Sequence, residues 1–304
     1  METLNNIVLT IQNYMSNYVL IIALLGAGLW FSFRLGFIQV RGFGEGMRRT
    51  FGGLFSKKGE AGADGMSSFQ ALATAIAAQV GTGNIAGAAT ALAIGGPGAI
   101  FWMWIAAFLG MATIYAEAIM AQKYKTVGVD GQVTGGPVYY IRAAFKGTFG
   151  KVLAGIFAIL ITLALGFMGN AVQSNSIAAS FHTAFGIPQW IMGLVVAVIA
   201  IFVFMGGMKR IAKVTETIVP FMAALYIVGS LIVIIYNYKN IPYAFASIFI
   251  GAFSPSSVVG GAAGATVKLA LTKGVARGLF SNEAGMGSTP HAHAVAKVNH
   301  PVEQ

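Results

Sequence analysis

The chain has 304 residues, of which 57% are hydrophobic, 9% are charged and none is cysteine. Soluble domains carry about 25% charged residues, so this composition excludes an ordinary soluble domain, and the lack of cysteine excludes disulfides and thiol catalysis. The net charge of +10 would suit nucleic acid, but the basic residues lie in a few loops between apolar runs. This placement argues against nucleic acid as a partner and makes the basic residues markers of membrane topology.

Apolar runs of membrane-spanning length follow one another along the chain. A bilayer core needs roughly 20 apolar residues per helix, and the first run is too long for the apolar region of a signal peptide, about 7–15 residues. The predicted spans are residues 14–33, 68–92, 98–121, 152–181, 188–206, 215–237 and 266–296. Residues 241–253 are apolar but short, which favours a re-entrant or interfacial helix. The pattern predicts an all-α polytopic membrane protein.

Basic residues alternate between the loops. They cluster after the first, third and fifth spans, whereas the turns near residues 93–97 and 182–187 contain neither Lys nor Arg. Because cytoplasmic loops are enriched in Lys and Arg, we expect a cell-membrane protein whose N-terminus lies outside. The second span then runs outward and the last runs inward. Three basic residues fall in the outer half of the last span, which favours a wet outer vestibule over a separate span at residues 256–275.

The second span is interrupted near its middle by Gly81, Thr82, Gly83 and Asn84. A broken helix in lipid leaves backbone groups unsatisfied at a cost of several kcal/mol each, so it is tolerated where it lines a cavity or holds a ligand. Freed N–H groups suit a carboxylate, and freed carbonyls with the Asn84 oxygen suit a hard cation such as Na⁺. Gly83 and Gly87 also have the spacing of close helix packing, which explains the glycines but not the polar residues. The pattern favours a binding site.

A second polar interruption lies at residues 278–288, where polar side chains, a carboxylate and three glycines punctuate an apolar stretch. Glu283 and Glu117 are the two acidic residues placed in the hydrocarbon zone, where a charge costs roughly 2.5–3.5 kcal/mol without a partner or water. A second broken helix is the favoured interpretation and a simple loop is the alternative. Glu283 alone forms no catalytic set, so the chain is not expected to be an enzyme and no catalytic residue is assigned.

Polar side chains also follow the apolar half of the fourth span. Asn170, Gln173 and Ser174 share one helical face by their spacing. Polar residues inside a span usually bond across helices, and Gln173 could instead contact a substrate. Both interpretations stay open.

Three histidines lie close to the C-terminus of the sequence, at positions 291, 293 and 300. His291 and His293 are two residues apart and fall on different helix faces, with no nearby thiol or carboxylate. We therefore expect a solvated flank at the inner membrane surface rather than a metal site.

Three segments resemble the alanine or glycine:cation symporter family. They are residues 79–104 (QVGTGNIAGAATALAIGGPGAIFWMW), 135–140 (GGPVYY) and 278–294 (GLFSNEAGMGSTPHAHA). The pattern VGxGN at residues 80–84 also resembles the first broken helix of neurotransmitter:sodium symporters, and residues 280–287 are similar to the sixth helix of those proteins. The similarity extends over the whole chain.

The resemblance implies a five-plus-five inverted-repeat transporter fold with discontinuous helices, preceded by one extra helix. Residues 1–64 would then hold the extra helix and a basic loop, residues 65–238 the first repeat, and residues 239–304 the start of the second. Family members continue with several more helices, so we expect an incomplete second repeat and a C-terminally truncated member.

The resemblance also implies a secondary active transporter that imports a small neutral amino acid, alanine or glycine, with co-transported sodium ion and no resident cofactor. The backbone N–H groups of Thr82 and Gly83 would hold the substrate carboxylate, and Phe280 would cover the substrate. The implied substrate-binding residues are Gly81, Thr82, Gly83, Gln173, Phe280 and Ser281. The implied sodium ligands are Ala77, Gln79, Val80, Asn84 and Ser281.

Two other functions stay open beside sodium symport. A permease of similar fold driven by protons would carry the same kind of substrate. A membrane fragment that does not transport would follow if the truncation is natural.

Overall fold

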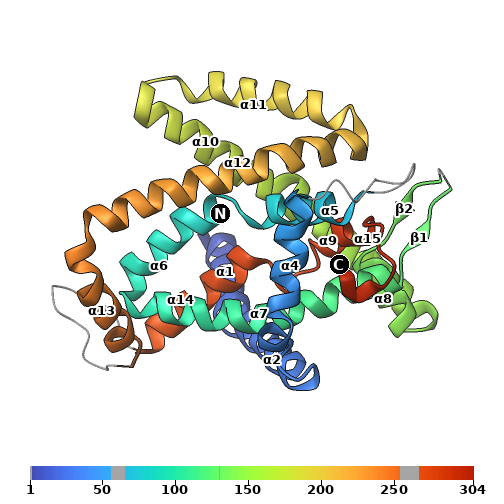
Figure 1. Cartoon of the computed structure of the whole chain (residues 1–304), viewed down its shortest axis with the longest axis horizontal. Helices are drawn as coiled ribbons and strands as arrows, with labels where there is room; N and C mark the ends of the chain where they lie inside the picture. Colours follow the sequence, from blue (N-terminus) through green and yellow to red (C-terminus); the bar gives the residue numbers. More distant parts are fainter. Residues whose placement is uncertain (1, 56–65, 130, 254–266) are drawn as a thin grey trace. The chain divides into compact units, whose positions relative to one another are not determined.

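The structure, a computed structural model, describes residues 2–55, 66–129, 131–253 and 267–304 (Figure 1). Over these ranges the regular secondary structure is helical apart from an isolated β-bridge between Met66 and Ala296 and one small hairpin. In the hairpin, β1 (Thr126–Val127) and β2 (Val133–Thr134) pair antiparallel with Thr126 opposite Thr134. The all-α prediction is confirmed with that addition. The short hairpin lies in the loop after the third predicted span, where the sequence indicated only a basic segment.

The helices follow the predicted order of apolar runs. In chain order they are α1 (Glu2–Tyr14), η1 (Met15–Val19), α2 (Leu20–Arg34), α3 (Ile38–Arg41), α4 (Phe43–Phe55), α5 (Ser68–Gln79), η2 (Gly83–Gly87), α6 (Ala88–Gly95), α7 (Gly98–Lys123), α8 (Pro137–Ala144), α9 (Gly147–Leu163), η3 (Ala164–Gly169), α10 (Asn170–Phe185), α11 (Gln189–Phe204), α12 (Gly207–Tyr236), η4 (Tyr238–Asn240), α13 (Ile241–Phe253), α14 (Val267–Asn282), α15 (Pro290–Ala294) and η5 (Pro301–Glu303). The segments η1, η2 and η3 are π-helical turns, a geometry found frequently at functional sites.

The described residues pack as two compact units that interleave along the sequence. Unit 1 consists of Met1–Glu45, Gly83–Ala116 and Leu225–Met286, and unit 2 of Gly46–Thr82, Glu117–Ala224 and Gly287–Gln304. Two of the boundaries between them, Thr82–Gly83 and Met286–Gly287, fall inside the two predicted interruptions.

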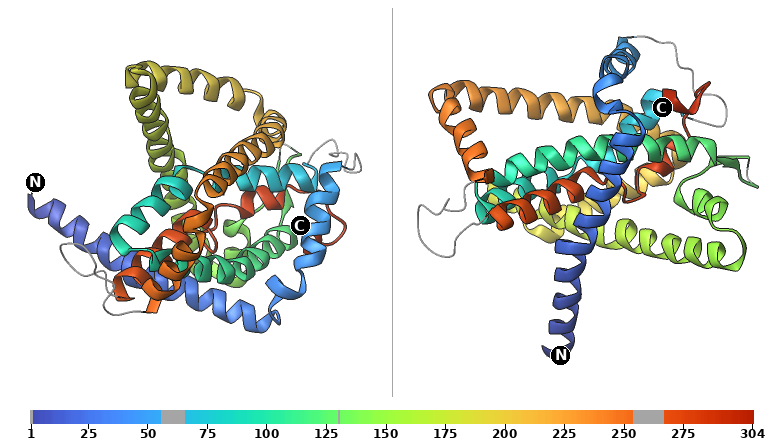
Figure 2. Two further views of the ribbon diagram at one scale, coloured as in Figure 1. Left: turned by 60° about the vertical axis from the view of Figure 1, so that its left-hand side comes forward. Right: turned by 90° about the horizontal axis from the view of Figure 1, so that it is seen from below.

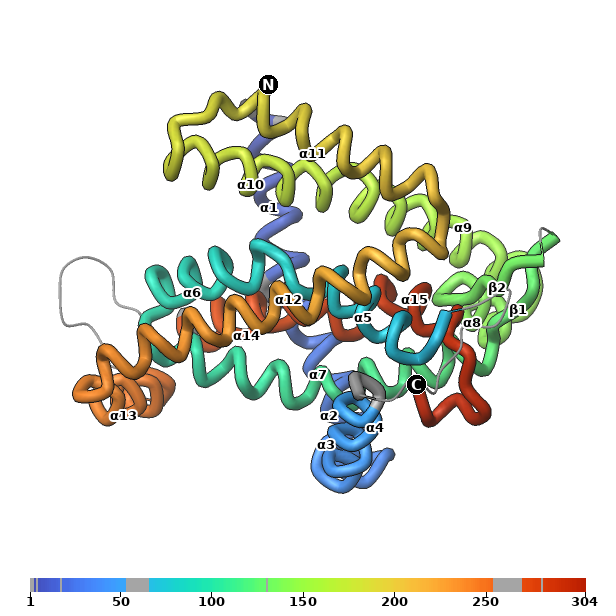
Figure 3. Tube along the Cα trace, turned by 45° about the horizontal axis from the view of Figure 1, so that its top comes forward, coloured from blue at the N-terminus to red at the C-terminus, as the bar shows by residue number. Residues whose placement is uncertain are grey.

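In unit 1, α6 and α14 lie side by side (Figure 3). Helices α1 and α2 form one helical run through η1 (Figure 2). Ile21 of α2 is buried in a core with Ala106, Val275 and Leu279. Glycines set the closest helix contacts. A Cβ at Gly274 would overlap the Ala99 carbonyl oxygen, and one at Gly278 would stand 3.1 Å from the Ala106 Cβ.

The GxxxG packing in this unit is therefore made by Gly274 and Gly278 of α14. The pair Gly83 and Gly87 was the packing alternative in the sequence, but a Cβ at Gly87 would meet the Arg277 side chain at an ordinary 3.6 Å. Gly87 does not require a close approach.

In unit 2, α10 and α11 run side by side, joined by a turn in which Gly186 takes a left-handed conformation (Figure 1). None of the residues of α11, all of which the structure describes, is buried. Its outer face includes Trp190 at 72% and Phe202 at 66% exposure. Apolar surface of this kind, here on a helix of 16 residues, is what a lipid environment covers.

Three helical stretches among the described residues are long and apolar enough to cross a membrane: Gly98–Lys123, Gly147–Phe185 and Gly207–Tyr236. The last two begin earlier than the predicted spans at residues 152–181 and 215–237. In both, the helix starts among the basic residues that precede the apolar run. Hydropathy assigns these basic residues to a loop because it detects only the apolar part of a helix.

Two short segments follow η4 in the chain, residues 241–253 and 254–266. Residues 241–253 form the 13-residue helix α13, which agrees with the short length predicted there; its place in the membrane stays a prediction. Residues 254–266, which include the first part of the alternative span at residues 256–275 and the first residue of the last predicted span, lie outside the described residues.

Candidate functional site

The first predicted interruption is present. Helix α5 begins with a capping box, in which the Ser67 hydroxyl accepts from the Gln70 N–H and the Gln70 side chain accepts from the Ser67 N–H. It ends at Gln79, and Val80 takes an extended conformation with φ −95° and ψ 99°. The regular α-helical hydrogen-bond pattern does not continue past Val80, and the chain resumes as the π-helical turn η2 at Gly83.

A glutamine from the fourth predicted span reaches this break. The backbone N–H of Thr82 donates to Gln173 Oε1 at 3.2 Å, and a Cβ at Gly81 would overlap Gln173 Nε2. Glycine at position 81 thus leaves the space that the amide occupies. The prediction that a polar side chain in this span bonds across helices is confirmed for Gln173, and its contact with a substrate stays a prediction.

The other two polar residues of that helix face bond within their own helix. Asn170 Nδ2 donates to the Gly166 carbonyl at 3.0 Å, and the Ser174 hydroxyl donates to the Ala171 carbonyl at 3.2 Å. Of the three, Gln173 alone is shown bonding to another element.

The second predicted interruption is also present. Helix α14 ends at Asn282, and α15 begins only at Pro290. The intervening backbone holds three left-handed residues: Glu283 at φ 52°, Gly285 at 84° and Gly287 at 78°. Such a conformation is uncommon for glutamate and easy for glycine. The two interpretations of this segment are both partly right, since a helix does break here but its continuation is only five residues long.

Side chains satisfy part of this second break. The Gly287 N–H donates to the Glu117 carboxylate at 3.2 Å, so one of the two acidic residues predicted in the hydrocarbon zone holds the backbone of the break. In unit 1, the Ser281 hydroxyl donates to the Gly83 carbonyl at 3.1 Å, and Ser281 is 6% exposed. Two oxygens, from α14 and from the start of η2, thus lie together in a partly buried position.

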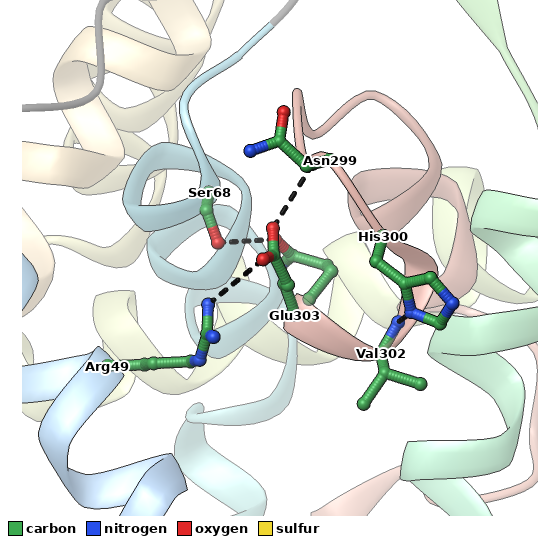
Figure 4. Close-up of polar contacts among 7 residues, drawn as sticks. Arg49, Ser68, Asn299, His300, Val302 and Glu303 are labelled. Carbon is green, nitrogen blue, oxygen red and sulfur yellow. Dashed lines mark hydrogen bonds and ion pairs between the residues drawn. The ribbon is translucent and has the colours of Figure 1, made fainter.

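The segment after the second break packs on the start of α5. Met66 N donates to the Val295 carbonyl at 3.2 Å and Lys297 N donates to the Met66 carbonyl at 2.9 Å. The Ser68 hydroxyl bonds to Gln304 Oε1 at 2.6 Å, and Arg49 forms an ion pair with Glu303 at 3.5 Å (Figure 4). Helix α5 is therefore anchored at its first residues and interrupted after its last.

A buried glutamine completes this anchor. Gln122 Nε2 donates to the carbonyls of His293, Ala294 and Ala296, and Lys125 Nζ donates to Gln122 Oε1 at 2.7 Å. Burial lowers the pKa of Lys125. No spacing in the sequence indicates these contacts, because Gln122 and residues 293–296 are more than 170 positions apart.

The predicted solvated flank of histidines is corrected at one position. His291 and His300 are exposed, but His293 is 4% exposed and bonds to the Gln304 side chain at 3.0 Å. The prediction was wrong for His293 because a pattern of polarity cannot show that the chain folds back over this residue.

Comparison with known proteins identifies the family of the chain. A family model described as the sodium:alanine symporter family matches residues 1–304. The chain belongs to the sodium:alanine symporter family. The resemblance that the sequence motifs carried is thereby confirmed.

Several curated members of the sodium:alanine symporter family are similar to this chain. It is 44% identical over 301 residues to the sodium/alanine symporter AgcS of Methanococcus maripaludis, covering 98% of this chain and 65% of that protein. It is 44% identical to a Bacillus subtilis protein named "Probable sodium/glutamine symporter GlnT", covering 100% and 61%. It is 43% identical to the B. subtilis amino-acid carrier protein AlsT, covering 100% and 62%.

The chain spans about 65% of the length of AgcS and less of the other two relatives. These relatives are named as symporters or carriers, which agrees with the prediction of a multi-pass transport protein that is not an enzyme. Their names give alanine in one case and glutamine in another, so the substrate of this family member does not follow from membership.

The residues predicted for substrate and ion are distributed over both units. In unit 2 the structure brings Gly81, Thr82 and Gln173 together, and in unit 1 it brings Gly83 and Ser281 together. The side chain of Phe280 lies outside the part of the chain that the structure describes. The other predicted sodium ligands lie on the last turn of α5, at the first break and in η2: Ala77, Gln79, Val80 and Asn84.

Proposed function

We propose that this protein imports a small neutral amino acid, alanine or glycine, together with sodium ion across the cell membrane. The observation that carries the proposal is the broken helix at Val80 and Gly81, which frees the Thr82 N–H to bond with a side-chain acceptor. It occurs in a chain of the sodium:alanine symporter family. Broken helices at the midplane are a mark of secondary transporters.

The substrate carboxylate is assigned to the consecutive N–H groups of Thr82 and Gly83. Peptide N–H groups at the start of a helical segment present a positive pole that suits an anion. Gly81 keeps the approach to these groups open, Gln173 lines the pocket, and Phe280 covers the substrate. A small pocket would prefer alanine or glycine, although one methylene is worth only roughly 1–3 kcal/mol.

The sodium ion is assigned to backbone and hydroxyl oxygens, the ligands that hard cations take. Asn84, Ser281 and the Gln79 carbonyl would hold one ion, and the carbonyls of Ala77 and Val80 would supply half of a second site. The partly buried pairing of Ser281 with the Gly83 carbonyl supports this assignment, because two oxygens lie together where η2 begins.

The architecture belongs to the proposal as well. We place the N-terminus outside and divide the chain into the extra helix and basic loop (residues 1–64), a first repeat (65–238) and the start of an inverted second repeat (239–304). The two broken helices then run in opposite directions, as an inverted repeat requires.

The opposite charges of the sodium ion and the substrate carboxylate would couple their transport. The cation offsets the substrate carboxylate, so only the jointly filled site would allow the change from outward-facing to inward-facing. An inward-moving Na⁺ carries about 2.3 kcal/mol per 100 mV of membrane potential, which is enough to concentrate the substrate.

The test is uptake of labelled alanine by the complete gene product in proteoliposomes. Uptake should require an inward Na⁺ gradient and should disappear when choline replaces Na⁺. Ser281→Ala should raise the Na⁺ concentration for half-maximal uptake, whereas Ser180→Ala, which removes a hydroxyl bonded within α10, should leave it unchanged.

Two results would contradict the proposal. Uptake driven by a pH gradient and indifferent to Na⁺ would identify the proton-coupled permease. Absence of uptake under either gradient, with the protein folded, would favour a membrane protein that does not transport.

A further inference from the structure

The hydrogen bond between Thr82 and Gln173 uses the same N–H that the proposed function assigns to the substrate carboxylate. Its acceptor is the side-chain oxygen of an uncharged amide at 3.2 Å. We propose that Gln173 is an internal placeholder: its oxygen holds the Thr82 N–H in the empty protein and is displaced when an amino acid binds. The inference rests on the proposed function, because it assumes that a carboxylate takes this N–H.

The break explains why the empty protein needs such an acceptor. A helix break frees backbone N–H groups, which then need an acceptor from a side chain, a ligand or water. The hydrogen bond between Thr82 and Gln173 is exposed, so a substrate can reach this N–H. The Gln173 oxygen satisfies this N–H without a ligand, and the planar amide offers an acceptor similar in position and geometry to one carboxylate oxygen. The Thr82 N–H therefore has an acceptor even when no substrate is bound.

The surroundings of Gln173 fit a side chain placed there for this contact. A Cβ at Gly81 would overlap the Gln173 amide nitrogen, so the smallest residue stands where the amide lies. Asn170 and Ser174, on the same face, bond to carbonyls of their own helical segment. The reach of the longer glutamine side chain distinguishes position 173 from both.

If substrate displaces Gln173, removing this side chain should change the affinity for substrate in a definite direction. A carboxylate accepts a stronger, charge-assisted hydrogen bond than an amide, so substrate replaces Gln173, but binding must first break the internal bond. Removing the placeholder should therefore strengthen substrate binding by about two- to tenfold, the range that one net hydrogen bond represents. A residue that simply contacts the substrate would give the opposite sign when removed.

The experiment measures alanine affinity by isothermal titration of the purified complete gene product at saturating Na⁺. Gln173→Ala should lower the dissociation constant for alanine by about two- to tenfold. Gln173→Glu should raise it, because a carboxylate at this position would hold the Thr82 N–H more tightly and repel the substrate. Asn170→Ala, one turn earlier on the same helix, should leave it unchanged.

Each result separates the inference from the proposed function. If Gln173→Ala weakens alanine binding or leaves it unchanged, while binding still depends on Na⁺, the placeholder is wrong and the transport proposal stands. If the unaltered protein binds no alanine with Na⁺, the proposed function itself fails. Gln173→Asn, one methylene too short to reach Thr82, replaces the alanine variant if that variant does not fold and should tighten binding in the same way.

Discussion

At the two helix breaks, the freed backbone N–H groups are hydrogen-bonded in different ways. At the first break, one residue leaves the helix into an extended conformation and a flexible glutamine from α10 accepts the Thr82 N–H. At the second, residues 283–289 depart from helix, three of them are left-handed, and the Glu117 carboxylate accepts the Gly287 N–H.

The difference is one of rigidity. The first break is held by the end of a side chain that can rotate away, whereas the second is fixed by backbone conformation, by tight packing and by the anchored segment that follows it. We infer that the first break is the changeable element and that the second is the fixed one. Substitutions at the second should therefore cost more stability than substitutions at the first.

The largest effect is expected for Gly287→Ala. Gly287 has φ 78°, and a Cβ there would stand 2.7 Å from Phe157 Cζ and 2.9 Å from Pro137 Cγ. Left-handed strain and overpacking together should lower the free energy of unfolding by about 4 kcal/mol. Chemical unfolding in detergent measures it.

The matched control for that substitution is Gly155→Ala, in the interior of α9, where a Cβ would meet no atom within 4 Å. It should stabilise slightly, by up to about 1 kcal/mol, because alanine favours helix. Equal effects of the two substitutions would remove the evidence that packing fixes the second break.

The next largest effect is expected for Gln122→Ala. Its buried amide donates to three carbonyls of the segment after the second break. The Ala296 carbonyl would keep Lys125 Nζ as a donor and the His293 carbonyl would keep the Ala296 N–H. Losing the hydrogen bonds of the buried amide to these carbonyls and to Lys125 should lower the free energy of unfolding by about 3 kcal/mol. Gln189→Ala, an exposed glutamine at the start of α11, should change it by less than about 0.5 kcal/mol, and a loss as large as that of Gln122→Ala would indicate a nonspecific effect.

The sequence predicted where both helices break, because glycines clustered with polar residues disrupt the regular apolar pattern that a continuous membrane helix needs. It did not predict what satisfies each break. Gln173, Asn170 and Ser174 share a face, and which of them leaves its own helix depends on the position of a segment 90 residues earlier. The burial of His293 was missed for the same reason, since Gln122 and Gln304 reach it only in the folded chain.

A smaller effect is expected for Glu117→Ala, which removes the charged acceptor of the Gly287 N–H. Hydrogen bonds to charged groups are worth about 1.5–3 kcal/mol, so the free energy of unfolding should fall by about 2 kcal/mol. Glu117→Gln keeps an acceptor oxygen and should lose less than half of that. If the glutamine variant is as unstable as the alanine variant, the hydrogen bond does not hold the second break.

The smallest effect is expected for Gly81→Ala, at the first break. Its Cβ would overlap only the end of the Gln173 side chain, which can rotate away, so the cost should be the loss of one hydrogen bond, about 1 kcal/mol. A double-mutant cycle isolates this cause. In the Gln173→Ala background no amide remains to be expelled, and Gly81→Ala should then cost nothing further. A cost that persists unchanged in that background would mean that the backbone at position 81 itself requires glycine, and the first break would be as rigid as the second.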